Sequence, residues 1–146
     1  MQSHNPYAPP VAKVDDIEED HSDESIEALP VSEKWKDRFK AIAHAGGVKF
    51  PNLKDLPKNE RRKAYGFNVL AFLFGPVYYI VKGMWKKGLA LLLVCVLVVI
   101  VLSIALEYFG LGKIANALGY GVSAVFAMRA NIDYYKKMVL GENGWW

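Results

Sequence analysis

Residues 88–106 have the sequence GLALLLVCVLVVIVLSIAL, which contains no charged side chain. A helix of this length is about 28 Å long, close to the thickness of the hydrocarbon core of a bilayer. The segment has no polar face, so in water it would need burial on every side, and a chain of 146 residues offers little to cover it. We therefore predict a transmembrane helix over residues 88–107.

The residues that follow predict a second transmembrane helix over residues 109–129. Four small residues recur there at every fourth position, and such a stripe lets two helix backbones approach closely in lipid. These candidate helix-packing residues are Ala115, Gly119, Ser123 and Ala127. Because the connection to the preceding helix is short, we expect an antiparallel transmembrane hairpin.

The residues before the hairpin, FNVLAFLFGPVYYIVKGMWKKG at 67–88, are apolar but interrupted by Gly75 and Pro76. Residues 67–81 would give about 22 Å of helix, which is too short to cross a bilayer. A crossing would also place the basic residues 61–63 and 82–87 on opposite sides of the membrane, against the positive-inside rule. We therefore predict a re-entrant or interfacial helix pair with its hinge at Gly75 and Pro76, and three true crossings remain the alternative.

The second half of this segment predicts an amphipathic helix lying in the membrane interface. Its expected apolar face consists of Val77, Ile80, Val81, Met84 and Trp85, and its opposite face carries Tyr79, Lys82 and Lys86. The residues expected to contact lipid are Trp35, Lys82, Trp85, Lys86 and Lys87.

Residues 31–64 predict a short cytoplasmic helix followed by a connector. In VSEKWKDRFKAIAHAGG at 31–47, Ser32 is a plausible N-cap, and Trp35, Phe39 and Ile42 share one face. The other faces are basic, so the helix could lie on an anionic membrane surface or pack on the rest of the protein. The sequence is compatible with both environments.

The two ends of the chain differ in charge. Residues 1–30 hold eight acidic side chains and one basic one, a net charge of −7, while the whole chain carries +3 and the remaining residues therefore carry +10. The first thirty residues lack hydrophobic periodicity, so we predict a disordered acidic tail, which could instead fold back onto the basic region or bind a partner. Residues 131–146 are expected to form a cytoplasmic C-terminal segment.

The sequence shows no sign of catalytic, cofactor or metal chemistry. It contains no phosphate-binding loop, dinucleotide-binding fingerprint or zinc-protease motif, and its single cysteine, Cys95, lies inside the apolar run. The start of the chain lacks the pattern of a signal peptide, so insertion is expected to use an internal segment. The basic clusters are better explained as orientation signals and contacts to anionic lipids than as a nucleic-acid surface.

Three stretches together resemble a known family. They are SEKWKDRFKAIAHAGG (32–47), FNVLAFLFGPVYYIVKGMWKKGLAL (67–91) and DYYKKMVLGENGWW (133–146), and the opening NPYAPP is similar to the start of many small proteobacterial inner-membrane proteins. The chain resembles the bacterial domain-of-unknown-function 2628 family of small membrane proteins. The resemblance implies a protein of the bacterial inner membrane, and it brings no catalytic residues or ligand. From the helical segments and the basic clusters described above, we expect an all-α integral membrane protein with both termini cytoplasmic.

Three functions are compatible with these patterns. The first is a structural, adaptor or regulatory membrane component that contacts anionic lipids and a membrane protein partner or further copies of itself. The second is a subunit of an oligomeric transporter or channel, because two transmembrane helices cannot enclose a path alone. The third is a membrane enzyme with a site built from Asn68 and Tyr78 or Tyr79, although no nucleophile and base are paired in the sequence.

Overall fold

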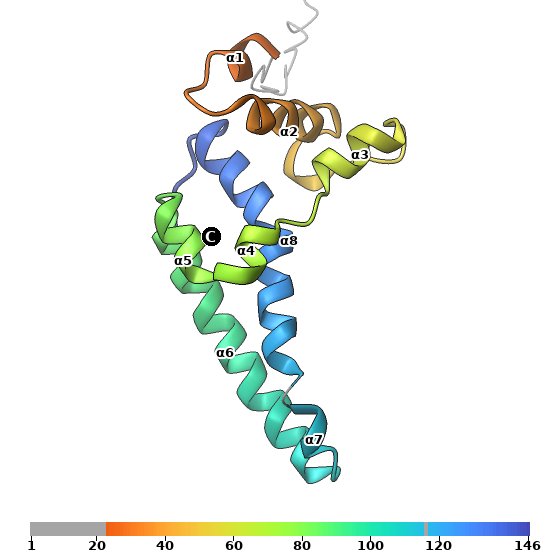
Figure 1. The fold of residues 1–146 in the computed structure, drawn as a ribbon, viewed down its shortest axis with the longest axis vertical. Coiled ribbons are helices and arrows are strands. Elements are labelled where there is room, and N and C mark those ends of the chain that lie inside the picture. Colours follow the sequence, from red (N-terminus) through yellow and green to blue (C-terminus); the bar gives the residue numbers. More distant parts are fainter. Residues whose placement is uncertain (1–22, 116) are drawn as a thin grey trace, which may run out of the picture.

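A computed structural model describes residues 23–115 and 117–146, and the regular elements in these ranges are all helical. In chain order they are α1 (Asp23–Glu27), α2 (Glu33–His44), the 3-10 helix η1 (Gly47–Lys49), α3 (Lys58–Ala64), α4 (Val69–Phe74), α5 (Pro76–Val81), α6 (Trp85–Tyr108), α7 (Gly112–Ala115) and α8 (Leu118–Met138). Figure 1 shows a head made of α1, α2 and α3, and a hairpin in which α6 leads away from the head and α8 returns beside it. The short helices α4 and α5 lie where the two parts meet.

Helix α2 packs its apolar stripe on the protein rather than leaving it free for a membrane surface. Phe39 and Ile42 are completely buried, and the ring of Phe39 lies against Tyr134 and Tyr135 near the end of α8. Ser32 occupies the N-cap position in an extended conformation, but its side chain makes no capping hydrogen bond. Burial of each large apolar side chain contributes about 1.5–3 kcal/mol, so this packing explains how the head attaches to the hairpin.

The prediction of disorder is wrong for residues 23–27, which form α1 and dock on α2. Ile26 is completely buried, and the carboxylate of Glu27 lies 2.7 Å from Nζ of Lys40 and 3.6 Å from Nζ of Lys36. The hydrogen bond from Lys40 holds the pKa of Glu27 below its usual value. The buried side chain of Ile26 and the ion pairs of Glu27 with the basic face of α2 therefore hold α1 against the head. Residues 28–30, the end of the predicted tail, form a turn and bend after α1, and residues 1–22 lie outside the described residues.

The apolar segment before the hairpin breaks at the residues predicted for its hinge. The side chain of Asn68 caps α4 by accepting a hydrogen bond of 3.0 Å from the backbone N–H of Ala71. Helix α4 ends at Phe74 and is followed by Gly75, whose φ of +46° favours glycine. Pro76 is the first residue of α5, where its missing N–H is tolerated.

The predicted amphipathic helix over residues 77–87 is interrupted. Helix α5 ends at Val81, Gly83 turns the chain with a φ of +69°, and α6 already begins at Trp85. Met84 is therefore completely buried instead of lying on the expected apolar face. The other members of that face, Val77, Ile80, Val81 and Trp85, remain exposed.

Helix α6 is the one helix in the described residues that is long and apolar enough to cross a membrane. It begins at Trp85, three residues before the predicted start, and is about 36 Å long at 1.5 Å per residue. Only 11% of its most apolar stretch of 18 residues is buried within the protein. This exposure is the opposite of what a core helix of a soluble protein would show.

The second predicted span, residues 109–129, is not one helix. A turn at Gly110, with a φ of +72°, leads into α7, which ends at Ala115, and α8 begins at Leu118. Helix α8 then continues through Arg129 to Met138, so residues 131–138 are not a separate C-terminal segment. The reason is that this polar half of α8 is buried between the head, α4 and α5.

Candidate functional site, a buried polar network

The head, α4 and α8 meet around one buried asparagine. Oδ1 of Asn131 accepts hydrogen bonds from Nδ2 of Asn68 at 2.9 Å and from Nη1 of Arg38 at 3.1 Å. Its Nδ2 donates to the carbonyl oxygen of Gly66 at 2.6 Å. Because Asn131 is only 1% exposed, these three bonds satisfy polar groups that water cannot reach.

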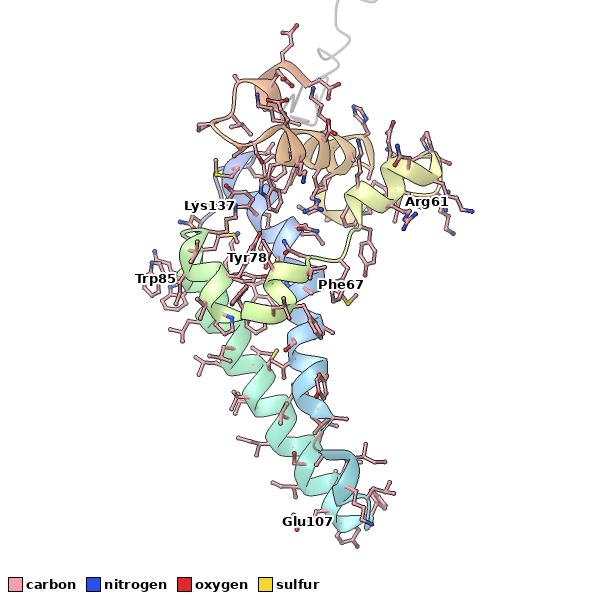
Figure 2. The ribbon with its side chains drawn as sticks, viewed as in Figure 1. Arg61, Phe67, Tyr78, Trp85, Glu107 and Lys137 are labelled. Atoms are coloured by element: carbon pink, nitrogen blue, oxygen red, sulfur yellow. The ribbon has the colours of Figure 1, made fainter. Side chains whose placement is uncertain are left out.

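Asn68 extends the network to α5. While its oxygen caps α4, its Nδ2 also donates to Oη of Tyr78 at 3.0 Å. Both side chains are buried, and Figure 2 shows Tyr78 in the space bounded by α4, α5 and α8. The asparagine therefore fixes the angle between the two short helices on either side of Gly75.

A second polar contact joins α5 to α8. Oη of Tyr79 donates to Oδ2 of Asp133 at 2.8 Å, and Nη2 of Arg129 lies 3.5 Å from the other carboxylate oxygen. Asp133 is 2% exposed, and a buried carboxylate needs such partners to offset its lost hydration. The ring of Tyr79 also packs edge-on against Phe126, 5.4 Å between centroids.

One cation, Lys82, joins the turn after α5 to the head and to α8. Nζ of Lys82 lies 4.5 Å from the ring centroid of Tyr134 and 5.0 Å from that of Trp35, and the Arg38 guanidinium lies 5.0 Å from the same Trp35 ring. Burial, followed by repulsion from Lys137, lowers the pKa of Lys82. Such cation–π contacts contribute more when they are shielded from water.

The C-terminal residues close over the start of α6. Nζ of Lys87 donates to the carbonyl oxygen of Glu142 at 2.7 Å, and the rings of Trp85 and Trp145 meet at 5.7 Å. Nζ of Lys137 donates to the carbonyl oxygen of Lys82 at 2.6 Å. The end of the chain is therefore part of the same packed region.

Of the five residues expected to contact lipid, two remain available for it and three make contacts within the protein. Trp85 is half-exposed, and Lys86 lies near its ring at 5.9 Å, so both stay candidates for lipid contact. Lys87 is 3% exposed and bonded to a carbonyl, which corrects the prediction that it faces lipid. Trp35 and Lys82 are likewise occupied with each other and with Tyr134, because α2 packs on α8.

The predicted stripe of small residues is not one helix face. Ala115 belongs to α7, whereas the other three residues lie on α8. Ala127 is buried and Ser123 is partly buried, but Gly119 is exposed, and a Cβ added to it would meet no atom within 4 Å. The close helix contact occurs elsewhere, at Gly88, where an added Cβ would lie 2.6 Å from Cβ of Tyr79.

The network is built from hydrogen bonds that hold helices together. It does bring Asn68 and Tyr78 into contact, as the enzyme hypothesis requires, but each is bonded within the network. In the described part of the chain, no group of three or more His, Cys, Asp or Glu side chains could hold a metal ion. This arrangement therefore positions the head on the hairpin.

Arg38, Asn131 and Asp133 were not predicted from the sequence as partners in a shared site. The sequence nevertheless indicated that the helix continues past residue 129, the predicted end of the second transmembrane helix. Two sets of residues keep the i, i+4 and i+7 spacing of one helix face across that position. These sets are Phe126, Ala130 and Asp133, and Ala127, Asn131 and Tyr134. Our prediction placed residues 131–146 in a separate cytoplasmic C-terminal segment instead.

Comparisons with known proteins identify relatives but no activity. The Uncharacterized protein YigF of Salmonella typhimurium strain LT2 is 33% identical over 122 residues, covering 79% of this chain and 90% of the relative. The protein of the same name from Escherichia coli K12 gives the same identity and coverage. No solved structure matches the chain.

A family model described as protein of unknown function (DUF2628) matches residues 22–139, which include the whole network. The chain therefore belongs to the DUF2628 family of proteins of unknown function.

Proposed function

We propose that this protein is a structural, adaptor or regulatory component of the bacterial inner membrane, in which a helical hairpin holds a cytoplasmic head at the membrane surface. The network around Asn131 and the contacts of Lys82 with Trp35 fix the orientation of the head. The working surface is the head together with the exposed residues at the membrane boundary.

The observation that carries this proposal is the exposed apolar surface of α6. Because only 11% of its most apolar stretch is buried, this helix would present a continuous hydrocarbon surface to water if the protein were soluble. The same surface continues onto α4 and α5, whose exposed apolar side chains are Val69, Leu70, Leu73, Phe74, Val77, Ile80 and Val81. Monomeric soluble proteins rarely expose apolar patches of such extent, and a bilayer removes the cost.

The distribution of charge supports an orientation with both termini in the cytoplasm. In Figure 2, Arg61 and Lys137 lie at the head end of the molecule, and Glu107 lies at the far tip of the hairpin. Basic residues at the cytoplasmic ends of membrane helices follow the positive-inside rule. The chain then crosses outward in α6 and returns through α7 and the first half of α8.

Cysteine labelling tests this topology. In a Cys95→Ala background, which removes the single native cysteine, we expect Glu107→Cys to react with a membrane-impermeant maleimide added outside the inner membrane. Lys54→Cys in the head and Glu142→Cys near the C-terminus should react only after that membrane is opened. The physical reason is that the impermeant reagent reaches only the outer end of the hairpin.

Two outcomes would contradict the proposal. Labelling of Glu142→Cys and Glu107→Cys from the same side would mean a single crossing by α6. Recovery of the full chain in the soluble fraction would mean that the apolar surface is covered by something other than lipid.

The alternative function, a subunit of an oligomeric transporter or channel, is favoured by the uncovered glycines of α8. Gly119 and Gly121 have no atom within 4 Å of an added Cβ, which leaves room for a helix of another copy. If copies meet there, Gly119→Leu should abolish in-membrane crosslinking between chains while leaving the protein folded. Equal crosslinking of this variant and the natural chain would exclude that interface.

A further inference from the structure

Two of the three basic clusters of the chain are used inside the protein. At residues 82–87, aromatic rings and a backbone carbonyl hold Lys82 and Lys87. At residues 129–137, the cations contact carboxylates, a tryptophan ring and a backbone carbonyl, and they are Arg129, Lys136 and Lys137. These two clusters therefore serve mainly the packing of the protein.

The third cluster, residues 54–63, differs because most of its cations face solvent. It carries five basic and two acidic side chains, a net charge of +3. Lys58, Arg61 and Arg62 are exposed, and no ion pair within the described residues involves any of them. We call these three side chains the α3 basic surface, and they are available to an anion from outside the protein.

Ion pairs fix α3 to the head. Nζ of Lys63 lies 3.0 Å from the carboxylate of Asp37 on α2, and the ring of His44 lies 3.5 Å from the carboxylate of Glu60. Figure 1 shows that α3 projects sideways from the head, beyond the outline of the hairpin. When the hairpin spans a bilayer, α3 therefore lies over the surface of that bilayer.

Exposed aromatic side chains mark the level of the membrane interface. Figure 2 shows Phe67 and Trp85 on opposite sides of the hairpin, at about the same level along the long axis, with Arg61 nearer the head. Both rings are half-exposed, and aromatic rings of this kind rest at the headgroup level of a bilayer. Beyond Trp85, the large exposed side chains of α6 are all leucine, valine and isoleucine until Tyr108. The hydrocarbon layer is therefore expected between Trp85 and Tyr108.

The exposed side chains from α3 to α4 change in the order in which the layers of a bilayer follow one another. After the cations come two aromatic and then two aliphatic side chains, which are Tyr65, Phe67, Val69 and Leu70. Three residues lead from the end of α3 at Ala64 to Phe67, at most about 11 Å of chain. The headgroup layer on each face of a bilayer is about 5–8 Å thick. The α3 basic surface is therefore within reach of the headgroups.

We propose that the α3 basic surface binds the headgroups of anionic phospholipids and gathers these lipids beside the head. This inference rests on the proposed function, because it needs the hairpin in the membrane. Arginine pairs with phosphate through two parallel hydrogen bonds, and each cation near an anionic leaflet adds to the attraction. A nucleic acid would offer the same charge, but the apolar side chains that follow on α4 would find no partner on it.

Lipid-specific quenching tests the proposal. The full chain carries a fluorophore on Phe67→Cys in the Cys95→Ala background, in vesicles of equal amounts of phosphatidylcholine and phosphatidylglycerol. A nitroxide quencher is placed on the fifth acyl carbon of one lipid or of the other. We expect labelled phosphatidylglycerol to quench several-fold more strongly. The double variant Arg61→Gln, Arg62→Gln should bring the two lipids close to equal quenching, because two cations at the anionic surface are lost.

Two control variants separate the α3 basic surface from the general charge of the head. Lys34→Gln removes an exposed cation of α2 and should keep the preference for phosphatidylglycerol. The double variant Arg61→Lys, Arg62→Lys keeps both charges and should retain most of the preference. Equal losses in Lys34→Gln and in the double glutamine variant would assign the preference to net charge and overturn the proposal.

The remaining outcomes distinguish this inference from the proposed function. A fluorophore on Leu97→Cys, an exposed position in the middle of α6, should be quenched by a nitroxide near the end of the acyl chain. If Leu97→Cys is quenched but Phe67→Cys responds equally to both lipids, the α3 basic surface binds no anionic headgroup and the proposed function stands. If Leu97→Cys is not quenched, both proposals fail. Loss of the lipid preference on addition of a short oligonucleotide would replace the lipid by a nucleic acid.

Discussion

Asn131→Leu should lower the free energy of unfolding by about 3–5 kcal/mol, the largest effect that we expect from a single substitution. Leucine has a similar volume but can neither accept the hydrogen bonds of Asn68 and Arg38 nor donate to the carbonyl of Gly66. Three polar groups would then lose their partner in a region that is closed to water. Thermal unfolding in mild detergent, followed by tryptophan fluorescence, should show a Tm lower by about 10 °C or more.

Asn143→Leu is the control for this variant. Asn143 is exposed near the C-terminus, and its Nδ2 makes one long hydrogen bond, of 3.3 Å, to the carbonyl oxygen of Gly83. Its replacement should change the free energy of unfolding by about 0.5 kcal/mol or less. Equal Tm values for the two leucine variants would mean that the network around Asn131 does not hold the head on the hairpin.

Gly88→Ala should also destabilise the protein, by about 1–3 kcal/mol, although alanine normally favours a helix over glycine. The added Cβ would lie 2.6 Å from Cβ of Tyr79, an atom next to the backbone that cannot swing away. Helices α5 and α6 must therefore separate, which also strains the 2.8 Å hydrogen bond between Tyr79 and Asp133. The same thermal unfolding measurement should show the loss.

Gly121→Ala provides the matched comparison. Gly121 lies inside α8, and a Cβ added there meets no atom within 4 Å. The substitution should be neutral or should stabilise the protein by about 0.5–1 kcal/mol, because alanine loses less backbone entropy on folding. A Gly88→Ala variant as stable as Gly121→Ala would contradict the close approach of α5 and α6.

The sequence by itself determined the features that depend on neighbouring residues. The long apolar run before Glu107 requires a helix without a polar face, and α6 is that helix. Gly75 and Pro76 end one helix and begin another because their backbone preferences act locally. The face of Phe39 and Ile42 followed from helical spacing, and the start of α2 directly after Ser32 followed from the preference of serine for the N-cap position.

Only the tertiary structure decided which polar residues are buried. Asn131 and Asp133 follow Arg129 and precede Lys136, so their sequence context is that of a chain leaving a membrane. They are buried because α2, α4 and α5, which are distant in the sequence, close around α8 and supply Arg38, Asn68 and Tyr79 as partners. Lys87 is buried for the same reason, since the C-terminal residues return to cover it. Such contacts depend on where the chain meets itself, and local sequence patterns do not contain that information.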